Sequence, residues 1–150
     1  MAFDPRTASG PHYTIGHFGR FADMPANHVI ENPKLPRPVT GKVFLRKLLG
    51  FTGMEISLNC MRPGEGVPFL HRHDTHEEAY VFVKGKGQIQ VDGTTLDVEE
   101  GTVVRVAPQP SRVWRNNGTE DLYFIVIQAK ENSFSPDERD GAILPDPPRW

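Results

Sequence analysis

The region between residues 41 and 130 constrains the fold most strongly, because it consists of short apolar or alternating segments separated by turn signals. Eight such segments recur at intervals of about ten residues. They are KVFLRKLL, GMEISLNCM, EEAYVFVK, GQIQV, TTLDV, TVVRVA, RVWR and DLYFIVIQA. This spacing predicts an all-β antiparallel sandwich or barrel. No helical period of 3.6 residues occurs here, so helices are expected only in the flanking segments.

Two turn signals support this interpretation. Asp92-Gly93 predicts a two-residue hairpin, because both central residues of a type I′ turn need positive φ angles. A second turn is expected at residues 116–118, with the sequence NNG.

The prolines divide the chain into three parts. Of the 14 prolines, six lie in residues 1–40, four in 41–130 and four in 131–150. The first part is expected to be an arm whose segment ENPKLPRPVTG runs extended along the surface, because proline cannot donate to a strand ladder. The second is the β-domain, and the third is a tail in which Ser135 and Pro136 could begin a short helix.

Charge and composition argue against several classes of partner. The 17 Lys and Arg nearly balance the 19 Asp and Glu, with no basic run, which disfavours nucleic acid. The longest apolar run, LYFIVI, is too short to cross a membrane, and the start of the chain does not resemble a signal peptide, so a cytoplasmic protein is expected. The single cysteine, Cys60, is interpreted as a buried small apolar residue.

The segment HRHDTHEE concentrates residues that bind metals. In a strand, His71 and His73 would project to the same side with Cα atoms roughly 6.6 Å apart. A divalent metal bound by two neutral imidazoles also needs negative charge, which a carboxylate on a neighbouring strand could supply. Glu77 and Glu78 are the candidates, and strand alternation allows only one of them to face the histidines.

The longer segment GEGVPFLHRHDTHEEAYVFVKG resembles the first motif of the cupins, which are small jelly-roll β-barrels. In that motif His-x-His is followed by three or four residues and a glutamate, and then by six residues and a glycine. The resemblance places the metal-ligand roles on His71, His73 and Glu78, with Gly85 as the glycine, while the earlier glycine falls one place early at Gly64. It extends through DGTTLDVEEGTVVRVAP and covers about 90 of the 150 residues. It implies a divalent ion, Fe, Mn, Ni or Zn, and a homodimer.

The second cupin motif is incomplete, because the histidine that supplies the fourth ligand is missing. Anchoring the motif on Asn116 puts Arg112 at that position, whereas anchoring on Asn117 or Pro108 puts Val113 there. Three ligands with open positions would suit Fe(II) oxygen chemistry or a Lewis acid. An inward Arg112 would instead oppose a divalent ion and offer donors to a carboxylate or phosphate. His76 is interpreted mainly as a solvated turn residue and only secondarily as a substitute ligand.

Four residues are candidates for substrate contact: Arg112, Tyr80, Phe82 and Trp114. The aromatic side chains are expected mainly in the barrel core, where they can also form pocket walls. Arg112 and Trp114 share one strand face, and the sequence leaves open whether that face lines the cavity. Arg105, like Arg46 and Lys47, is expected to face outward.

If Glu78 faces inward, Ala79, Val81 and Val83 face outward, and LYFIVI is apolar on both faces. Such strands are normally covered on both sides. We therefore expect a homodimer with the arm packed across or near its interface.

Three functions remain open from sequence, of which the third is a structural or protein-interaction barrel whose cavity would be packed with side chains. The first is a metal-binding cupin that binds or transforms a small polar or anionic molecule inside the barrel, with dioxygenase-like or isomerase-like chemistry. The second is a non-catalytic, metal-free binding or sensing cupin in which Arg112 contacts an anionic ligand. Cupin barrels host several chemistries, so neither the substrate nor catalysis itself follows from the fold.

Overall fold

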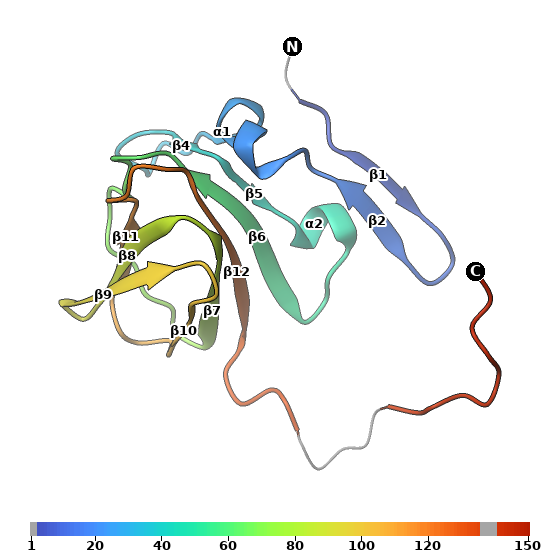
Figure 1. Ribbon diagram of the computed structural model, residues 1–150. Helices are drawn as coiled ribbons and strands as arrows, with labels where there is room; N and C mark the ends of the chain where they lie inside the picture. The colour runs from blue at the N-terminus through green and yellow to red at the C-terminus, as the bar shows by residue number, and fades with distance from the viewer. Residues whose placement is uncertain (1–2, 136–140) are drawn as a thin grey trace.

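The structure is a computed structural model that describes residues 3–135 and 141–150, and most of its regular structure is β-strand (Figure 1). The strands are β1 Arg6–Ser9, β2 Thr14–His17, β3 Val29–Ile30, β4 Val39–Thr40, β5 Lys42–Phe44, β6 Met54–Met61, β7 His76–Lys84, β8 Lys86–Val91, β9 Thr94–Glu99, β10 Val103–Val106, β11 Arg112–Arg115 and β12 Leu122–Lys130. The helical turns are η1 Phe21–Asp23, α1 Met24–Asn27 and α2 Arg46–Leu49. The prediction of an all-β fold is confirmed.

Two antiparallel sheets form the main body. The larger has five strands in the order β10-β7-β12-β6-β5, and the smaller has three in the order β11-β8-β9. A shared core of Tyr80, Phe82 and Phe124 from the larger sheet and Ile89 and Trp114 from the smaller one lies between them. The sheets therefore face each other as the two halves of a jelly roll, although within the described residues no strand ladder joins them into a closed cylinder.

Local turn chemistry explains the connections on either side of β8, of which only the one to β9 is a hairpin. Asp92 and Gly93 have φ angles of 45° and 81°, which confirms the predicted turn between β8 and β9. Gly85 joins β7 to β8 with a φ of 84°, and a Cβ placed there would lie 2.5 Å from the backbone oxygen of Asp121. Only glycine fits that position, so the motif glycine is explained by backbone packing.

One prediction for residues 41–130 is wrong, because the segment KVFLRKLL does not form a single strand. It leaves the sheet after Phe44 and forms the one-turn helix α2, which ends at Gly50 with a φ of 74°. The carboxylate of Glu55 on β6 accepts hydrogen bonds from the backbone N–H groups of Leu45 and Arg46 at the start of the turn. This cap comes from a later strand, so the start of the helix has no capping signal in the local sequence.

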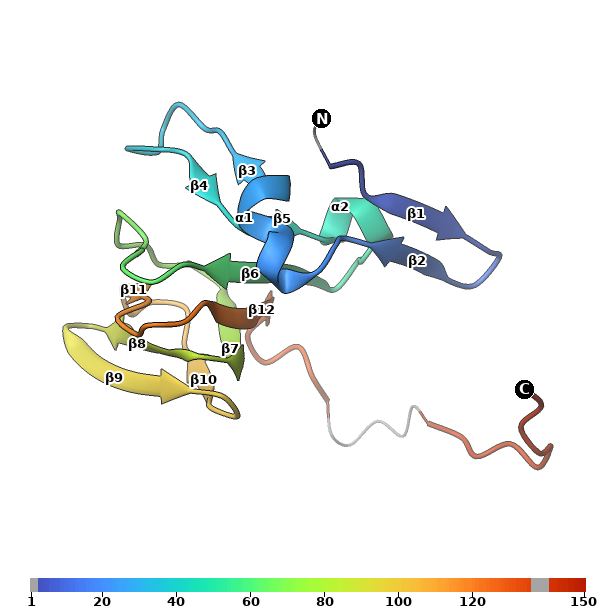
Figure 2. The same cartoon turned by 45° about the horizontal axis from the view of Figure 1, so that its top comes forward.

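The arm covers part of the outer face of the larger sheet (Figure 2). Phe18 and Met24 pack with Val43, Leu45 and Cys60 in a second apolar cluster over β5 and β6. The β1–β2 hairpin extends away from the body in both views. The proline-rich segment stays outside the two main sheets, since only its end, β4, pairs, and it pairs with β3.

The outer face over β7 and β10 is more open. Strand alternation holds there as predicted, since Arg105 contacts the carboxylates of Glu77 and Glu131 on the outside. Val103 is 62% exposed and Val83 is 37% exposed. The helix predicted from Ser135 and Pro136 falls mainly on residues 136–140, which lie outside the described residues. Every helix in the described part of the chain is too short and too polar to cross a bilayer.

Candidate functional site

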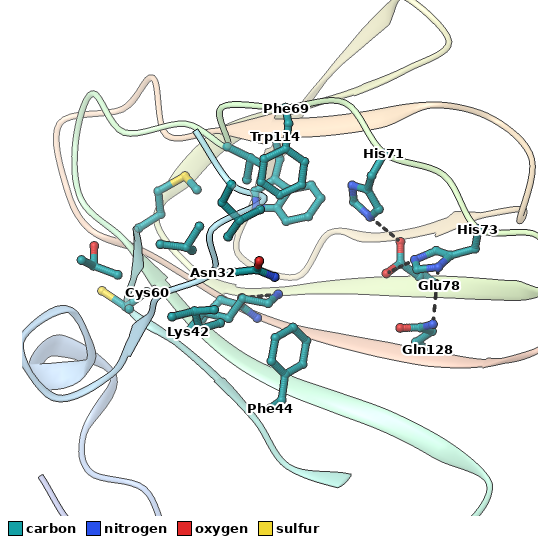
Figure 3. Close-up of a pocket in the computed structure, with 18 residues that line it drawn as sticks. Asn32, Lys42, Phe44, Cys60, Phe69, His71, His73, Glu78, Trp114 and Gln128 are labelled. Carbon is teal, nitrogen blue, oxygen red and sulfur yellow. Dashed lines mark hydrogen bonds and ion pairs between the residues drawn. The ribbon is translucent and has the colours of Figure 1, made fainter. Parts of the chain in front are cut away.

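A cavity of 310 Å³ opens between the larger sheet, the smaller sheet and the arm (Figure 3). That volume is at the lower end of the range for small-molecule sites. Its wall combines apolar and polar side chains, among them Asn32, Lys42, Phe69, His71, Glu78 and Trp114. It is therefore suited to a small molecule with an apolar body and a few polar groups.

His71, His73 and Glu78 converge at one end of this cavity. Glu78 projects inward from β7, whereas the two histidines lie in the extended loop before that strand rather than in a regular strand as expected. The loop is held by two contacts, a β-bridge between His71 and Arg112 and a hydrogen bond from the His73 N–H to the Pro108 carbonyl. Extended backbone still directs both imidazoles to the same side, with ring centroids 5.3 Å apart.

The three side chains place potential ligand atoms close together. His73 Nε2 lies 3.1 Å from Glu78 Oε1, and His71 Nε2 lies 3.8 Å from Glu78 Oε2. One ligand atom from each residue lies within 4.8 Å of the other two. This spacing is compact enough for one ion with bonds of about 2.0–2.2 Å to nitrogen and oxygen.

The surroundings of Glu78 keep its carboxylate ionised. Burial raises its pKa, but the nearby imidazoles of His71 and His73 and the hydrogen bond from Tyr80 outweigh burial and bring the pKa to about 2. The Tyr80 hydroxyl donates to Glu78 Oε2 at 2.6 Å, and burial is the main reason that the pKa of Tyr80 is raised. Burial also lowers the pKa of His73, which favours the neutral imidazole that a metal requires.

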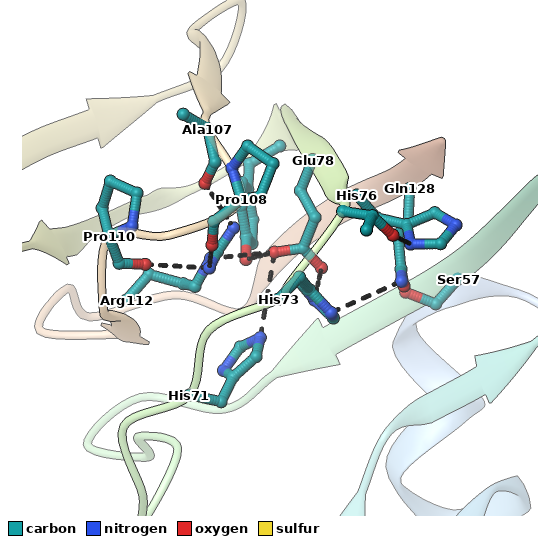
Figure 4. A network of polar contacts seen from close by, with 12 residues as sticks. Ser57, His71, His73, His76, Glu78, Ala107, Pro108, Pro110, Arg112 and Gln128 are labelled. Carbon is teal, nitrogen blue, oxygen red and sulfur yellow. Dashed lines mark hydrogen bonds and ion pairs between the residues drawn. The ribbon is translucent and has the colours of Figure 1, made fainter. Parts of the chain in front are cut away.

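Arg112 occupies the position where the fourth histidine of the cupin motif would stand. Asn116 is buried and donates to the carbonyls of Met61 and Glu120, and Arg112, four residues before it, is the one of the two candidate residues that faces Glu78. Arg112 is 0% exposed, and its Nε lies 3.1 Å from Glu78 Oε2. The guanidinium is thus the permanent counter-charge of Glu78 (Figure 4).

The remaining donors of Arg112 are directed at backbone. Its Nη1 donates to the carbonyls of Pro108 and Pro110, both at 2.8 Å, and its Nη2 donates to the Ala107 carbonyl at 2.9 Å. Arg112 therefore lies behind the cavity wall, held by the β10–β11 loop. Val113, the alternative at this position, points to the other face of β11 and is only half-buried.

The donor set fits a divalent metal ion. Two imidazole nitrogens and one carboxylate suit Fe, Mn, Ni or Zn and leave coordination positions open. His73 Nε2 and His71 Nδ1 are buried and have no hydrogen-bond partner among the described residues. Leaving buried polar atoms unpaired is costly, and a metal would satisfy the His73 nitrogen that faces Glu78. Arg112 opposes this by placing a positive charge on the far side of the same carboxylate.

Only one of the four residues predicted to contact substrate lines the cavity. Trp114 lines the cavity, with its ring edge-on to His71 at 5.6 Å. Tyr80, Phe82 and Arg112 are not among the cavity-lining residues. Tyr80 instead bonds Glu78, and Phe82 packs on the Phe124 ring in the core. Strand alternation directs these side chains to the inward face of the sheets, but they lie deeper in the core than the cavity and so do not line it.

His76 also lies away from the cluster, with its Nδ1 bonded to the Thr75 hydroxyl. Sequence reasoning missed the polar residues that line or support the cavity wall on β5, β6 and β12: Lys42, Ser57, Asn59 and Gln128. Their signal is weak but present, since the run ISLN alternates polar Ser57 and Asn59 with apolar residues. An inward polar pair of this kind indicates a lined cavity rather than a packed core.

Comparison with known proteins agrees with this geometry. The family model described as Cupin domain matches residues 57–128. A cupin protein from Bacteroides fragilis is 31% identical, with a TM-score of 0.64 and with 77% of this chain and 94% of that chain covered. No curated protein matches the chain.

Two further solved structures carry functional names. A predicted oxalate decarboxylase from Thermotoga maritima is 19% identical, with a TM-score of 0.58 and coverage of 74% of this chain and 96% of that chain. A protein from Acidithiobacillus ferrooxidans, provisionally assigned as a sugar phosphate isomerase, is 25% identical, with a TM-score of 0.53 and coverage of 59% and 58%. The motif, the jelly-roll topology and the similarity to the Bacteroides fragilis protein together establish that this chain belongs to the cupin family.

Proposed function

We propose that the protein is a metal-dependent cupin that binds or transforms a small polar or anionic molecule in its cavity. The observation that carries this proposal is the convergence of His71, His73 and Glu78 at the end of a 310 Å³ cavity. A divalent ion at this position would act as a Lewis acid on a substrate oxygen or would bind O₂, which fits isomerase-like or dioxygenase-like chemistry.

The roles of the protein residues follow from their surroundings. His71 and His73 would bind the ion, and Glu78 would supply the negative charge that Tyr80 and Arg112 hold in place. Trp114 and Phe69 would form an apolar wall that excludes water from the open coordination positions.

A metal-free binding protein is the second candidate, and one observation favours it. Arg112 already neutralises Glu78, so the carboxylate does not require an ion for charge balance. The part of this alternative that uses Arg112 as a ligand contact has little support, because the side chain is fully buried and donates to three carbonyls.

Metal analysis separates the two candidates. Protein purified without chelator is expected to carry metal, and Fe(II), Mn(II), Ni(II) or Zn(II) at 100 times its dissociation constant should stabilise the fold by about 2.7 kcal/mol. For a domain of this size that corresponds to a rise in Tm of about 10 °C. His71→Ala and His73→Ala should abolish the rise.

His76→Ala is the matched control, since His76 belongs to the same segment but not to the cluster, and it should keep the full rise. Less than about a tenth of an equivalent of metal, together with no stabilisation by any of the four ions, would favour the metal-free candidate.

We also propose the homodimer expected from the sequence. Its support is the open outer face around Val83 and Val103 and the β1–β2 hairpin, which extends away from the rest of its own chain. Light scattering should give twice the mass of one chain, and Val103→Glu should lower it if this face is the interface. A wild-type monomer would contradict the proposal.

A further inference from the structure

The second notable group in the cavity is the ammonium of Lys42, which reaches inward from β5 (Figure 3). Its Nζ donates to Ser57 Oγ at 3.1 Å and to Asn59 Oδ1 at 3.0 Å. It lies 4.8 Å from the ring centroid of Phe44 and 5.8 Å from that of Trp114. Hydroxyl, amide and aromatic faces thus surround the cation, away from the metal-ligating residues.

The acceptors of Lys42 are held in place by the strands beneath them. Asn59 pairs directly with Lys42 in the β5–β6 ladder, and its Nδ2 donates to the backbone oxygens of Ser57 and Phe124. Those bonds fix the orientation of the amide, so Oδ1 must face the ammonium. Ser57 and Asn59 are only 2% and 4% exposed. Two buried polar side chains therefore position one lysine, which a packed apolar core would not need.

The charge of Lys42 is not neutralised within the described residues. Its ammonium makes no ion pair there, and Glu78, the acidic residue in the cavity lining, is already bonded by Tyr80 and flanked by Arg112. An ammonium has three N–H donors, and two of them are used by Ser57 and Asn59. One donor and one unit of positive charge are thus left for a molecule in the cavity.

We propose that Lys42, held by Ser57 and Asn59, is an anion-binding subsite that takes the carboxylate of a ligand whose body is apolar. Carboxylate fits better than phosphate, because the subsite offers one cation and one spare donor, whereas phosphate is usually met by several donors. The apolar wall formed by Leu35 and Phe69 fits the remainder of such a ligand.

The inference rests on the proposed function in one respect, the use of this cavity for a small molecule. It is independent of metal binding. The cluster of His71, His73 and Glu78 occupies the other end of the same cavity. A ligand whose carboxylate binds Lys42 would therefore extend toward this cluster. The ligand class is then a small carboxylic acid with a second oxygen available to a metal.

The test uses chelator-treated full-length protein, so that metal cannot bind the probe. Benzoate, 3-phenylpropionate and hexanoate are titrated at pH 7 by calorimetry, each beside its uncharged amide. At least one acid is expected to bind ten times more tightly than its amide, because a charge-assisted hydrogen bond is lost in the amide. Lys42→Met should remove this preference while leaving binding of the amide within threefold.

Two further variants keep the test informative. Lys42→Gln preserves a polar side chain beside Ser57 and Asn59, so it can replace Lys42→Met if that variant folds poorly. It should also lose the preference for the acid over its amide. Lys86→Met is the matched control, because Lys86 pairs with Glu99 on the surface outside the cavity, and it should bind as wild type. Equal binding of every acid and its amide, no saturable binding by any acid, or an unchanged preference in folded Lys42→Gln would overturn the subsite.

The experiments distinguish a failure of the Lys42 subsite from a failure of the metal proposal. Acid binding that depends on Lys42 in a protein that takes up no metal would remove the metal proposal alone. Metal binding lost in His71→Ala, combined with acid binding that ignores Lys42, would remove the subsite alone.

Discussion

Replacement of Arg112 by methionine removes the counter-charge of Glu78 while keeping a long side chain in the same space. In the wild type the guanidinium Nε lies 3.1 Å from the carboxylate, and the other guanidinium nitrogens donate to three backbone carbonyls. The variant leaves a buried carboxylate without its cation and three carbonyls without their donors. The prediction is a large loss of stability that a divalent metal partly restores.

The size of the loss follows from the type of contact removed. Breaking a buried ion pair by removing one partner typically costs about 3–5 kcal/mol. We add no separate cost for the three lost hydrogen bonds to carbonyls, because the β10–β11 loop can move and let water replace the missing donors. We therefore expect a loss of about 4 kcal/mol. With a urea dependence of about 2 kcal/mol per molar, the midpoint should fall by about 2 M.

Urea unfolding followed by the fluorescence of buried Trp114 measures this loss, with and without the stabilising metal. Metal should stabilise Arg112→Met more than wild type, by at least tenfold in affinity or about 1.4 kcal/mol, because the ion no longer competes with a permanent cation for Glu78.

Arg115→Met is the matched control. Arg115 is exposed on the same strand and bonds Gln88, so its loss should change the free energy of unfolding by less than about 0.5 kcal/mol. A loss below about 1 kcal/mol in Arg112→Met, or equal stabilisation of both proteins by metal, would refute the reasoning.

Three other outcomes are expected. Burial lowers the pKa of Lys42 to about 8 against the opposing effects of Glu78 and Glu55, so carboxylate binding should be full below that pH and fall as pH rises through it in calorimetry. Gly85→Ala should cost at least about 2 kcal/mol in urea unfolding, since its φ is 84° and a Cβ would meet backbone. Burial raises the pKa of the Cys60 thiol to about 12, so a thiol reagent should label it at pH 8 only after unfolding.

The metal-ligand candidates could be predicted because their information is local. Strand alternation allows only one of Glu77 and Glu78 to face the histidines, and the resemblance to the cupin motif selects Glu78. In the structure Glu78 faces inward while Glu77 contacts Arg105 outside. The Asp92-Gly93 turn was predictable for the same reason, since a two-residue hairpin depends only on its own φ angles.

Other features depend on partners far away in the sequence. Helix α2 begins where Glu55 of the next strand caps it, and Lys42 becomes a cavity group only because the β5–β6 register sets Asn59 beside it. The direction of Arg112 depends on the carbonyls of the β10–β11 loop, whose backbone path cannot be read from residue types. These contacts arise from tertiary packing, so local patterns carry no signal for them.

The arm, which forms part of the cavity wall, separates two properties of the molecule. Asn32 and Leu35 contribute to the wall, yet they belong to a proline-rich loop that is outside the two main sheets and is fastened by the hydrogen bond from Arg37 Nη2 to the Gly66 carbonyl. Substitutions in this loop would change the shape of the cavity wall without disturbing the strand pairing of the main sheets. Ligand selectivity and fold stability are therefore encoded in different stretches of the chain, and the first can diverge while the second is conserved.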